Sequence, residues 1–185
     1  MLKMNELKRG MCIKLDGKLV RIVEFQHVKP GKGAAFTRTK IKHVSTGRVV
    51  EKTFRASDNI EQVNLQTKDM QLLYSDPDGY HFMDQESFEQ ITLDAATLGD
   101  AVNYLKDEDT IKVETQEGKP IGVELPSAVV LQVTEAPPAV KGNTATGATK
   151  TAVLETGFNV QVPLFIEQGE KVKIDTRSGA FLSRG

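Results

Sequence analysis

Closely spaced turn signals constrain the fold of this chain more than any other feature of its sequence. Segments of the kind that reverse the chain direction recur along most of its 185 residues. They are Asp16-Gly17, Pro30-Gly31, Thr46-Gly47, Asp76-Pro77-Asp78-Gly79, Glu117-Gly118 and Ser178-Gly179. Because glycine and aspartate tolerate the positive φ of tight turns and proline presets φ, these segments divide the chain into short runs. Runs of this length favour an all-β fold of small barrels over a parallel α/β sheet.

The runs between the turns have the composition of β-strands. Many of their residues are β-branched, and such residues suit a pleated, half-buried surface. The two-residue connection Asp16-Gly17 is a strong hairpin signal between the first two runs. We predict strands over residues 11–15, 19–28, 36–44, 48–55, 71–74, 110–115, 121–124, 129–133, 160–165 and 171–175.

One segment has the periodicity of a helix. Apolar residues recur at helix-like intervals across residues 93–106. Asp94 and Thr97 are both suitable N-cap residues, so the start of the helix is open between them. Because Gly99 has low helix propensity, we expect a short or broken helix.

Charge is sorted along the chain, although the formal net charge is only −1. Residues 1–64 hold 14 Lys and Arg against 6 Asp and Glu, residues 65–127 hold 4 against 14, and residues 128–185 hold 6 against 5. We predict three small barrel domains with these bounds. The basic first domain suggests a polyanionic partner, and we interpret the acidic second domain as a solvated surface. Since barrels of roughly 60 residues have modest cores, at least one tight interface between neighbours is expected.

The location of the protein follows from what its sequence lacks. No stretch approaches the roughly 20 apolar residues that span a bilayer, and the first residues have no signal-peptide character. Cys12 is the single cysteine, so no intrachain disulfide forms and a reducing cytosol fits. We therefore expect a cytoplasmic protein with no membrane partner. We interpret Cys12, which stands in an apolar run, as a small buried hydrophobe.

The segment Lys29-Pro30-Gly31-Lys32-Gly33 joins two predicted strands. Pro30 presets φ for the first central position of a turn, and Gly31 suits the positive φ that a type II turn requires next. Residues without side chains flank Lys32 on both sides, so it is free to enter a narrow site or to be held by a modifying enzyme. The alternative is an ordinary exposed lysine in a flexible hairpin. The spacing does not match a phosphate-binding P-loop.

A row of cations follows this loop. Arg38, Lys40 and Lys42 are spaced by two residues and so share one face of a strand, at intervals of roughly 7 Å that suit a phosphate backbone. The alternative is a solvated strand face. Aromatic residues are only 6% of the chain, which favours recognition of folded RNA over stacking on single strands. Four further cations are candidates to widen this surface: Lys29, Arg48, Lys52 and Arg55.

Segments in all three predicted domains resemble the elongation factor P family of bacterial translation factors. The loop around Lys32, with Ala35-Phe36, resembles that family's modification loop. Glu51-Lys52-Thr53-Phe54 and His81-Phe82-Met83 are similar to its internal landmarks. The residues of the third domain that match the family signature are Lys150, Ala152, Gly157, Val160, Val162, Pro163, Ile166 and Gly169, and residues 175–184 resemble the family's C-terminal end.

The resemblance implies both a fold and a function. The fold is a KOW/SH3-like barrel followed by two OB-fold barrels, in an L-shaped arrangement similar to a tRNA. The function is that of a non-enzymatic elongation factor that binds the ribosome between the peptidyl and exit sites, beside the peptidyl-tRNA, and relieves stalling at consecutive prolines. The family's modified residue carries over to Lys32, which implies a lysine-modifying enzyme as a partner. We expect a monomer with no cofactor and no metal.

The resemblance also assigns candidate RNA-binding residues to the third domain. The segment 142–150 resembles the loop that reaches the small ribosomal subunit and the exit-site message. Asn143 stands where an acidic residue is expected, so a charge-dependent contact of this loop is not carried over. The candidates are Gly142, Asn143, Thr144, Thr146, Gly147, Lys150, Arg177 and Arg184.

Three other functions stay open at the level of sequence. For an enzyme, His27, His43 and His81 are scattered without metal-ligand spacing, and no nucleophile motif occurs. A general RNA-binding or transcription-associated barrel protein would use the basic first domain on many RNAs. A divergent paralogue of the same family would relieve a narrower set of stalls, although the intact Pro-Gly-Lys-Gly tip favours the main branch.

Overall fold

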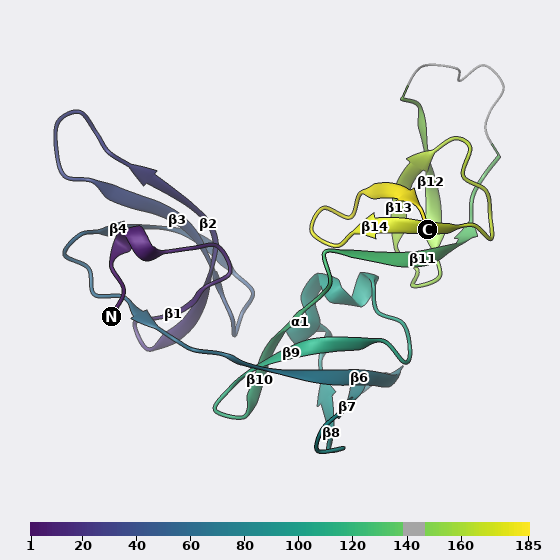
Figure 1. The fold of residues 1–185 in the computed structure, drawn as a ribbon, viewed down its shortest axis with the longest axis horizontal. Helices are drawn as coiled ribbons and strands as arrows, with labels where there is room; N and C mark the ends of the chain where they lie inside the picture. Colours follow the sequence, from purple (N-terminus) through teal and green to yellow (C-terminus); the bar gives the residue numbers. More distant parts are fainter. Residues whose placement is uncertain (139–146) are drawn as a thin grey trace. The chain divides into compact units, whose positions relative to one another are not determined.

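A computed structural model describes residues 1–138 and 147–185, and within these ranges the fold consists almost entirely of β-strands (Figure 1). The strands form three five-stranded sheets in the described residues, which confirms the predicted all-β fold. The chain divides into two compact units, residues 1–67 with 114–122 and residues 68–113 with 123–185. The division into three domains stays a prediction.

The N-terminal sheet is a meander with its apolar side chains gathered on one face. Asp16 and Gly17 both have positive φ, 49° and 76°, so the predicted two-residue hairpin turn is confirmed. The core of the sheet consists of Leu7, Ile13, Val20, Ile22, Ile41, Phe54 and Ile60. The strand order is β4-β3-β2-β1-β5, with β1 (Cys12–Leu15), β2 (Lys18–Val28), β3 (Phe36–His43), β4 (Val49–Arg55) and β5 (Glu61–Gln62), and the 3-10 helix η1 (Met4–Glu6) precedes it.

The middle sheet has the strand order β10-β9-β6-β7-β8. Three of its strands, β6, β9 and β10, pass from one compact unit into the other. Its core consists of Met70, Leu72, Phe82, Leu93, Leu98, Ala101, Leu105, Ile111 and Val113. The strands are β6 (Gln66–Asp76), β7 (Gly79–Asp84), β8 (Gln90–Leu93), β9 (Thr110–Gln116) and β10 (Lys119–Glu124).

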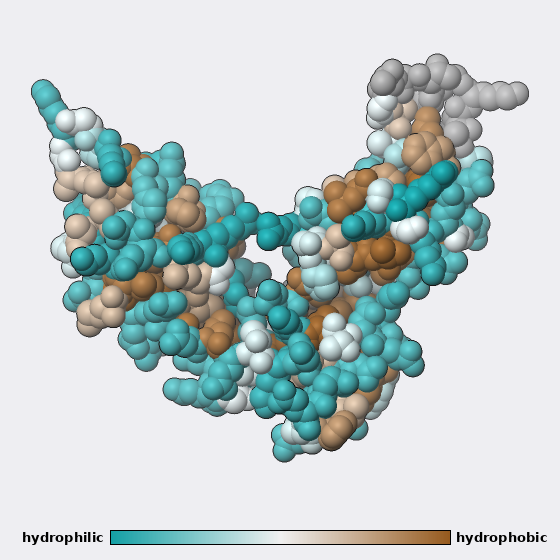
Figure 2. Space-filling view, in the orientation of Figure 1, coloured by the Kyte–Doolittle hydropathy of each residue, from teal (hydrophilic) through white to brown (hydrophobic). Residues whose placement is uncertain are grey.

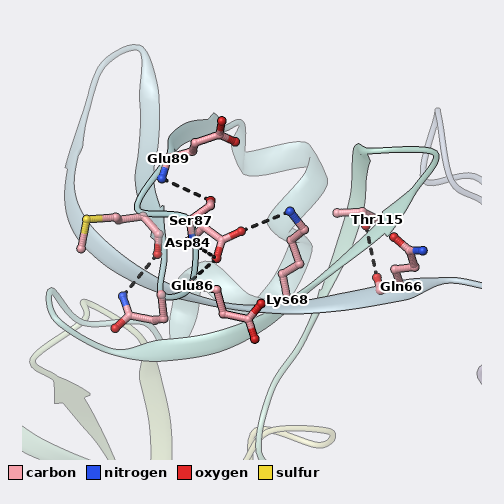
Figure 3. Close-up of polar contacts among 9 residues, drawn as sticks. Gln66, Lys68, Asp84, Glu86, Ser87, Glu89 and Thr115 are labelled. Atoms are coloured by element: carbon pink, nitrogen blue, oxygen red, sulfur yellow. Dashed lines mark hydrogen bonds and ion pairs between the residues drawn. The ribbon is translucent and has the colours of Figure 1, made fainter.

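A buried carboxylate fixes the loop between β7 and β8 (Figure 3). Asp84 Oδ1 accepts hydrogen bonds from the backbone N–H groups of Glu86 (2.8 Å) and Ser87 (3.3 Å), and Oδ2 accepts one from Lys68 Nζ at 3.2 Å. These bonds stabilise the ionised form, and they lower the pKa of Asp84 from 3.8 to about 2, with the two backbone donors the largest causes. The loop therefore depends on a charged side chain in a site that is only 4% exposed.

The predicted helical segment is helical but broken at the expected residue. Helix α1 (Ala95–Leu98) ends at Gly99, whose φ is 57°, and a 3-10 helix η2 (Gly99–Asn103) follows. The N-cap is Asp94, whose Oδ1 accepts a 2.7 Å hydrogen bond from Thr97 N. Hydrogen bonding by the Thr97 side chain first, and by its backbone N–H second, favours the ionised carboxylate and lowers the pKa of Asp94.

The C-terminal sheet has the strand order β13-β12-β11-β14-β15. Its core residues alternate along the strands with exposed ones, as a sheet with one solvated face requires. The core consists of Leu131, Val133, Ala152, Leu154, Val160, Val162, Ile166, Val172 and Ile174. The strands are β11 (Ala128–Glu135), β12 (Thr149–Leu154), β13 (Asn159–Pro163), β14 (Lys171–Asp175) and β15 (Phe181–Arg184).

Tyr104, just after η2, packs against the C-terminal sheet within the compact unit of residues 68–113 and 123–185. It is only 4% exposed and belongs to the core of the C-terminal sheet. Its ring meets Phe158 edge-to-face at 5.4 Å. Beside it, Thr156 Oγ1 donates a 2.6 Å hydrogen bond to the carbonyl of Asn103. The expected tight interface between neighbouring small sheets is therefore present here.

Candidate functional site

The loop between β2 and β3 carries the candidate lysine. The hairpin closes with the pair Val28–Phe36, and residues 29–35 connect the strands without regular structure. The loop projects beyond the rest of its sheet (Figure 1), and its end carries hydrophilic side chains (Figure 2). Lys32 is exposed, and within the part of the chain that the structure describes its ammonium group has no hydrogen-bond or ion-pair partner. The loop thus presents a free cation at its end.

The predicted conformation of Gly31 is wrong, because the positive φ falls on Gly33 instead. Gly33 has φ = 112°, whereas Gly31 is not in the positive region. The loop also bends back at Gly33, since a Cβ there would lie 3.8 Å from Pro30 Cγ. A Cβ at Gly31 would meet nothing within 4 Å. Gly33, on the far side of Lys32, is therefore the residue whose backbone shapes the tip.

The three cations after the loop share the exposed face of β3. Arg38, Lys40 and Lys42 are exposed, while the alternate residues Thr37, Thr39 and Ile41 are buried. The middle cation is not free. Its Nζ lies 2.9 Å from Glu24 Oε2 on β2, and Glu51 lies opposite it on β4.

The pair Glu24–Lys40 perturbs both of its members. The hydrogen bond and charge of Lys40 lower the pKa of Glu24, and those of Glu24 raise the pKa of Lys40. Sequence reasoning missed this pair, although the hairpin register that aligns Val28 with Phe36 brings Glu24 opposite Lys40 with no irregularity between them. The cationic row is interrupted at its centre.

One of the cations expected to widen this surface lies elsewhere. Lys52 pairs with Thr39, whose side chain points into the buried face, so Lys52 does not share a face with Arg38. Arg55 pairs with Phe36, near the end of the loop, and is exposed. Lys29 and Arg48 are exposed as well. The prediction is therefore wrong for Lys52.

The candidates in the third domain fall partly outside the described residues. Lys150 donates a 2.8 Å hydrogen bond from Nζ to the carbonyl of Pro137, and Gly147, at φ = 83°, stands just before β12. Arg177 lies exposed in the turn after β14, where its N–H donates a 2.7 Å hydrogen bond to Asp175 Oδ1. The candidates that lie outside the described residues are Gly142, Asn143, Thr144 and Thr146.

Arg184 is already engaged within its own sheet. Its guanidinium carbon lies 4.8 Å from the centre of the Phe165 ring, and its Nη2 lies 3.3 Å from Glu170 Oε1. Half of the Arg184 side chain is exposed, so these contacts orient it without removing it from solvent.

The described residues offer few groups for covalent or metal chemistry. In residues 1–138 and 147–185, no three His, Cys, Asp or Glu side chains gather in a way that holds a metal ion. Cys12 is buried as predicted, and burial raises the pKa of its thiol. No helix within these ranges has both the length and the apolar character to cross a bilayer.

Three consecutive segments of the chain match models of known protein families. Residues 3–60 match the elongation factor P (EF-P) KOW-like domain, residues 65–123 match the elongation factor P OB domain, and residues 129–184 match the elongation factor P C-terminal domain. The chain is 52% identical over 184 residues to elongation factor P of Moorella thermoacetica, covering 100% of both proteins. It is equally identical, over 184 residues, to elongation factor P of Synechocystis sp., covering 98% of that protein.

A solved structure with low sequence identity has a similar fold. Eukaryotic translation initiation factor 5A from Methanococcus jannaschii superposes with a TM-score of 0.51 at 21% identity. The match covers 66% of this chain and 92% of that protein. At this identity the likeness concerns the fold alone, and it agrees with the predicted series of KOW-like and OB barrels.

Proposed function

Since the chain belongs to the elongation factor P family and is thereby a translation elongation factor, we propose that it binds the ribosome beside the peptidyl-tRNA, between the peptidyl and exit sites. There it stimulates peptide-bond formation and relieves stalling at consecutive prolines. Lys32, at the end of the loop between β2 and β3, enters the peptidyl-transfer site.

The observation that carries this proposal is the unpaired, exposed ammonium group of Lys32 on a projecting loop. Pro30 and Gly33 shape the loop, and the two neighbours of Lys32, Gly31 and Gly33, have no side chains that could pack along its stem. A cation held in this way loses little on entering an RNA cavity, because it breaks no ion pair of its own. Phosphate groups in the cavity attract it.

The proposed mechanism is orientation of the substrate. Proline fixes its own φ and restricts the residue before it, so a proline-rich nascent chain holds the reacting ester away from the incoming amine. A misplacement of this kind costs on the order of 100-fold in rate, or about 2.7 kcal/mol. Lys32 braces the terminal CCA of the peptidyl-tRNA and restores the geometry. The chemical step stays with the ribosome, so the factor itself is not an enzyme.

The exposed cations support binding of the body of the tRNA. Arg38 and Lys42, on the exposed face of β3, contact backbone phosphates. Lys150, Arg177 and Arg184 in the C-terminal sheet are the candidates for further RNA contacts, together with residues 142–147. Such contacts fix the position of the factor without reading base sequence.

A modification of Lys32 extends its reach. A lysine-modifying enzyme needs access to Nζ from several directions, and the glycines that flank Lys32 leave that access open. We propose that such an enzyme acts on Lys32 in the cytoplasm, and that the factor works as a monomer. Intact-mass and peptide mass spectrometry of protein from its native host would identify an added group on Lys32.

The experiment that tests the proposal measures synthesis through a Pro-Pro-Pro stretch in a reconstituted translation system. Lys32→Ala is expected to abolish the stimulation that the wild-type factor gives, and an unchanged rate would reject the tip mechanism. Lys18→Ala, which removes an exposed lysine from the other end of β2, is the matched control and is expected to keep full stimulation. A template without consecutive prolines should be translated equally with all three proteins.

A further inference from the structure

Two consecutive residues of β1 are buried, which a strand with one solvated face does not allow. Successive side chains of a strand point to opposite faces. Ile13 is fully buried in the core of the N-terminal sheet. Its neighbour Cys12 is only 3% exposed but stands outside that core cluster. The outer face of β1 must therefore be covered by another part of the same compact unit.

The cover is the end of the β9–β10 hairpin. Residues 114–122 belong to the same compact unit as residues 1–67. Glu114 is only 8% exposed and Thr115 only 3%, although both lie near the end of β9. Thr115 Oγ1 lies 3.4 Å from the carbonyl of Gln66, to which it donates. Burial raises the pKa of the Cys12 thiol most, the charge of Arg21 lowers it and the charge of Glu114 raises it, so both charges act at this side chain.

Arg21 connects the N-terminal sheet with the end of the β9–β10 hairpin. It pairs with Cys12 across β1 and β2, so its side chain leaves the sheet on the same outer face. Its Nη1 donates to the carbonyl of Gly10 at 3.3 Å and to Glu114 Oε1 at 3.2 Å, while Nη2 donates to Glu114 Oε2. Two parallel bonds from one guanidinium to one carboxylate fix direction as well as distance.

Gly122 on β10 leaves space for this ion pair. A Cβ at Gly122 would lie 3.3 Å from Glu114 Oε2 and 3.6 Å from Arg21 Nη2. The φ of Gly122 is not in the positive region, so the backbone conformation does not explain a glycine there. The close approach of the Arg21 and Glu114 side chains explains the glycine at this position.

We propose that Arg21 and Glu114, seated over Gly122, are positioning residues that hold the N-terminal sheet and the end of the β9–β10 hairpin as one rigid body. The inference rests on the proposed function, because its consequence is that the pair fixes the direction of the Lys32 loop relative to the β9–β10 hairpin. An arginine suits this task, since its planar fork couples orientation to charge neutralisation, which a flexible lysine does not. Removal of Arg21 takes the ion-pair partner from Glu114, whose side chain is only 11% exposed.

The direct test measures a distance inside this compact unit. Nitroxide labels are attached at Ser45→Cys and Lys119→Cys, both exposed positions of the wild-type chain. Cys12 is replaced by alanine in every background, because variants that uncover the outer face of β1 would expose its thiol to the label. We expect a narrow distance distribution in the wild-type background and a broad one with Arg21→Glu or with Glu114→Arg. The double exchange Arg21→Glu with Glu114→Arg is expected to restore a narrow distribution.

Milder variants keep the test decisive if a charge reversal fails to fold. Arg21→Lys keeps the charge but loses the fork, and Gly122→Val keeps both charges but displaces them. Both are expected to broaden the distribution, whereas Lys112→Glu, an exposed charge reversal on the same strand β9, is expected to leave it narrow. A narrow distribution in Arg21→Lys and Gly122→Val would overturn the inference.

Translation through Pro-Pro-Pro separates this inference from the proposed function. Arg21→Glu is expected to lower the maximal rate at saturating factor by at least about tenfold, within the roughly 100-fold that misplacement costs, and the double exchange is expected to recover it. Full activity in Arg21→Glu together with an inactive Lys32→Ala would refute the positioning role and leave the proposed function standing. Full activity in Lys32→Ala would remove the proposed function, while the distance measurement would still decide whether the pair holds the two parts together.

Discussion

Glu24 Oε2 lies 2.9 Å from Lys40 Nζ across the two strands that lead to the tip loop. Lys40 therefore stands between two carboxylates, with Glu24 on β2 and Glu51 on β4. On a surface that contacts phosphate, a cation with an internal partner contributes less than a free one, because binding must first break the internal pair. The Glu24–Lys40 pair is therefore expected to limit the affinity of the exposed face of β3 for phosphate.

Neutralising Glu24 should strengthen binding to the ribosome. In Glu24→Gln the partner of Lys40 loses its charge, so Lys40 becomes available to phosphate. We expect a higher affinity at low salt, and a plot of log K against log[salt] whose slope is steeper by about one. Filter binding or light scattering across a salt series measures both. Glu61→Gln, an exposed acid on β5, is the matched control, and equal slopes for the two variants would argue against this account.

The cations on either side of Lys40 should carry most of the salt dependence. Arg38→Ala with Lys42→Ala is expected to reduce the salt slope by about two, since each phosphate contact contributes about one. Lys40→Ala alone should change the slope by less than one. A wild-type slope in the variant that combines Arg38→Ala, Lys40→Ala and Lys42→Ala would reject phosphate contact by this face. The Glu24–Lys40 pair is tested by the single variants, because the salt slope should change less in Lys40→Ala than in Arg38→Ala or Lys42→Ala.

Much of the fold was predictable because its local signals agree. Asp16-Gly17 and the alternating residues of β3 reported the hairpin turn and the strand face correctly, since turn chemistry and two-residue periodicity are local properties. The strands β5, β7, β8, β12 and β15 were not predicted. β7 (Gly79–Asp84) contains no β-branched residue and forms through pairing with β6 and β8, which is a tertiary effect.

The candidate site was predictable in its residues but not in its electrostatics. The sequence around Lys32 predicted an exposed cation in a hairpin loop, because proline and glycine form a turn there and glycines flank the lysine on both sides. It did not predict that Gly33 rather than Gly31 takes the positive φ. It also missed the partner of Lys40, since the pairing of Glu24 with Lys40 follows from the register that aligns Val28 with Phe36, and the irregular loop 29–35 has no two-residue turn type that would report this register.

Gly33 should be more sensitive to substitution than Gly31. Gly33→Ala places a Cβ on a backbone with φ = 112°, which costs roughly 1–3 kcal/mol if the loop keeps its shape. We expect the tip to relax instead, with reduced stimulation on Pro-Pro-Pro and an unchanged melting temperature. Gly31→Ala meets open space and should keep near-normal activity. Equal activities in the two variants would show that the conformation at Gly33 is unimportant.

Tyr104 should stabilise the unit that contains the middle and C-terminal sheets. Tyr104→Ala removes a ring that is only 4% exposed and packs on Phe158, so a loss of about 3–5 kcal/mol is expected from denaturant unfolding. We expect the C-terminal sheet to lose its cooperativity with the middle sheet, seen as a second transition. Phe88→Ala, which removes an aromatic ring that is 68% exposed, should change stability by less than about 0.5 kcal/mol.

Asp84 should make stability depend on acid pH. Its pKa is about 2 in the folded protein, against 3.8 ordinarily, so the unfolded chain takes up a proton first as pH falls. The stabilisation is therefore complete above about pH 5 and is lost progressively towards pH 2. Asp84→Asn should be less stable than wild type at pH 6, and urea midpoints at several pH values should show this gap closing with acid. Lys68→Ala should keep most of the pH dependence, because the backbone N–H groups of Glu86 and Ser87 contribute more than Lys68 does to the lowered pKa. A gap that stays constant down to pH 2.5 would contradict the assignment.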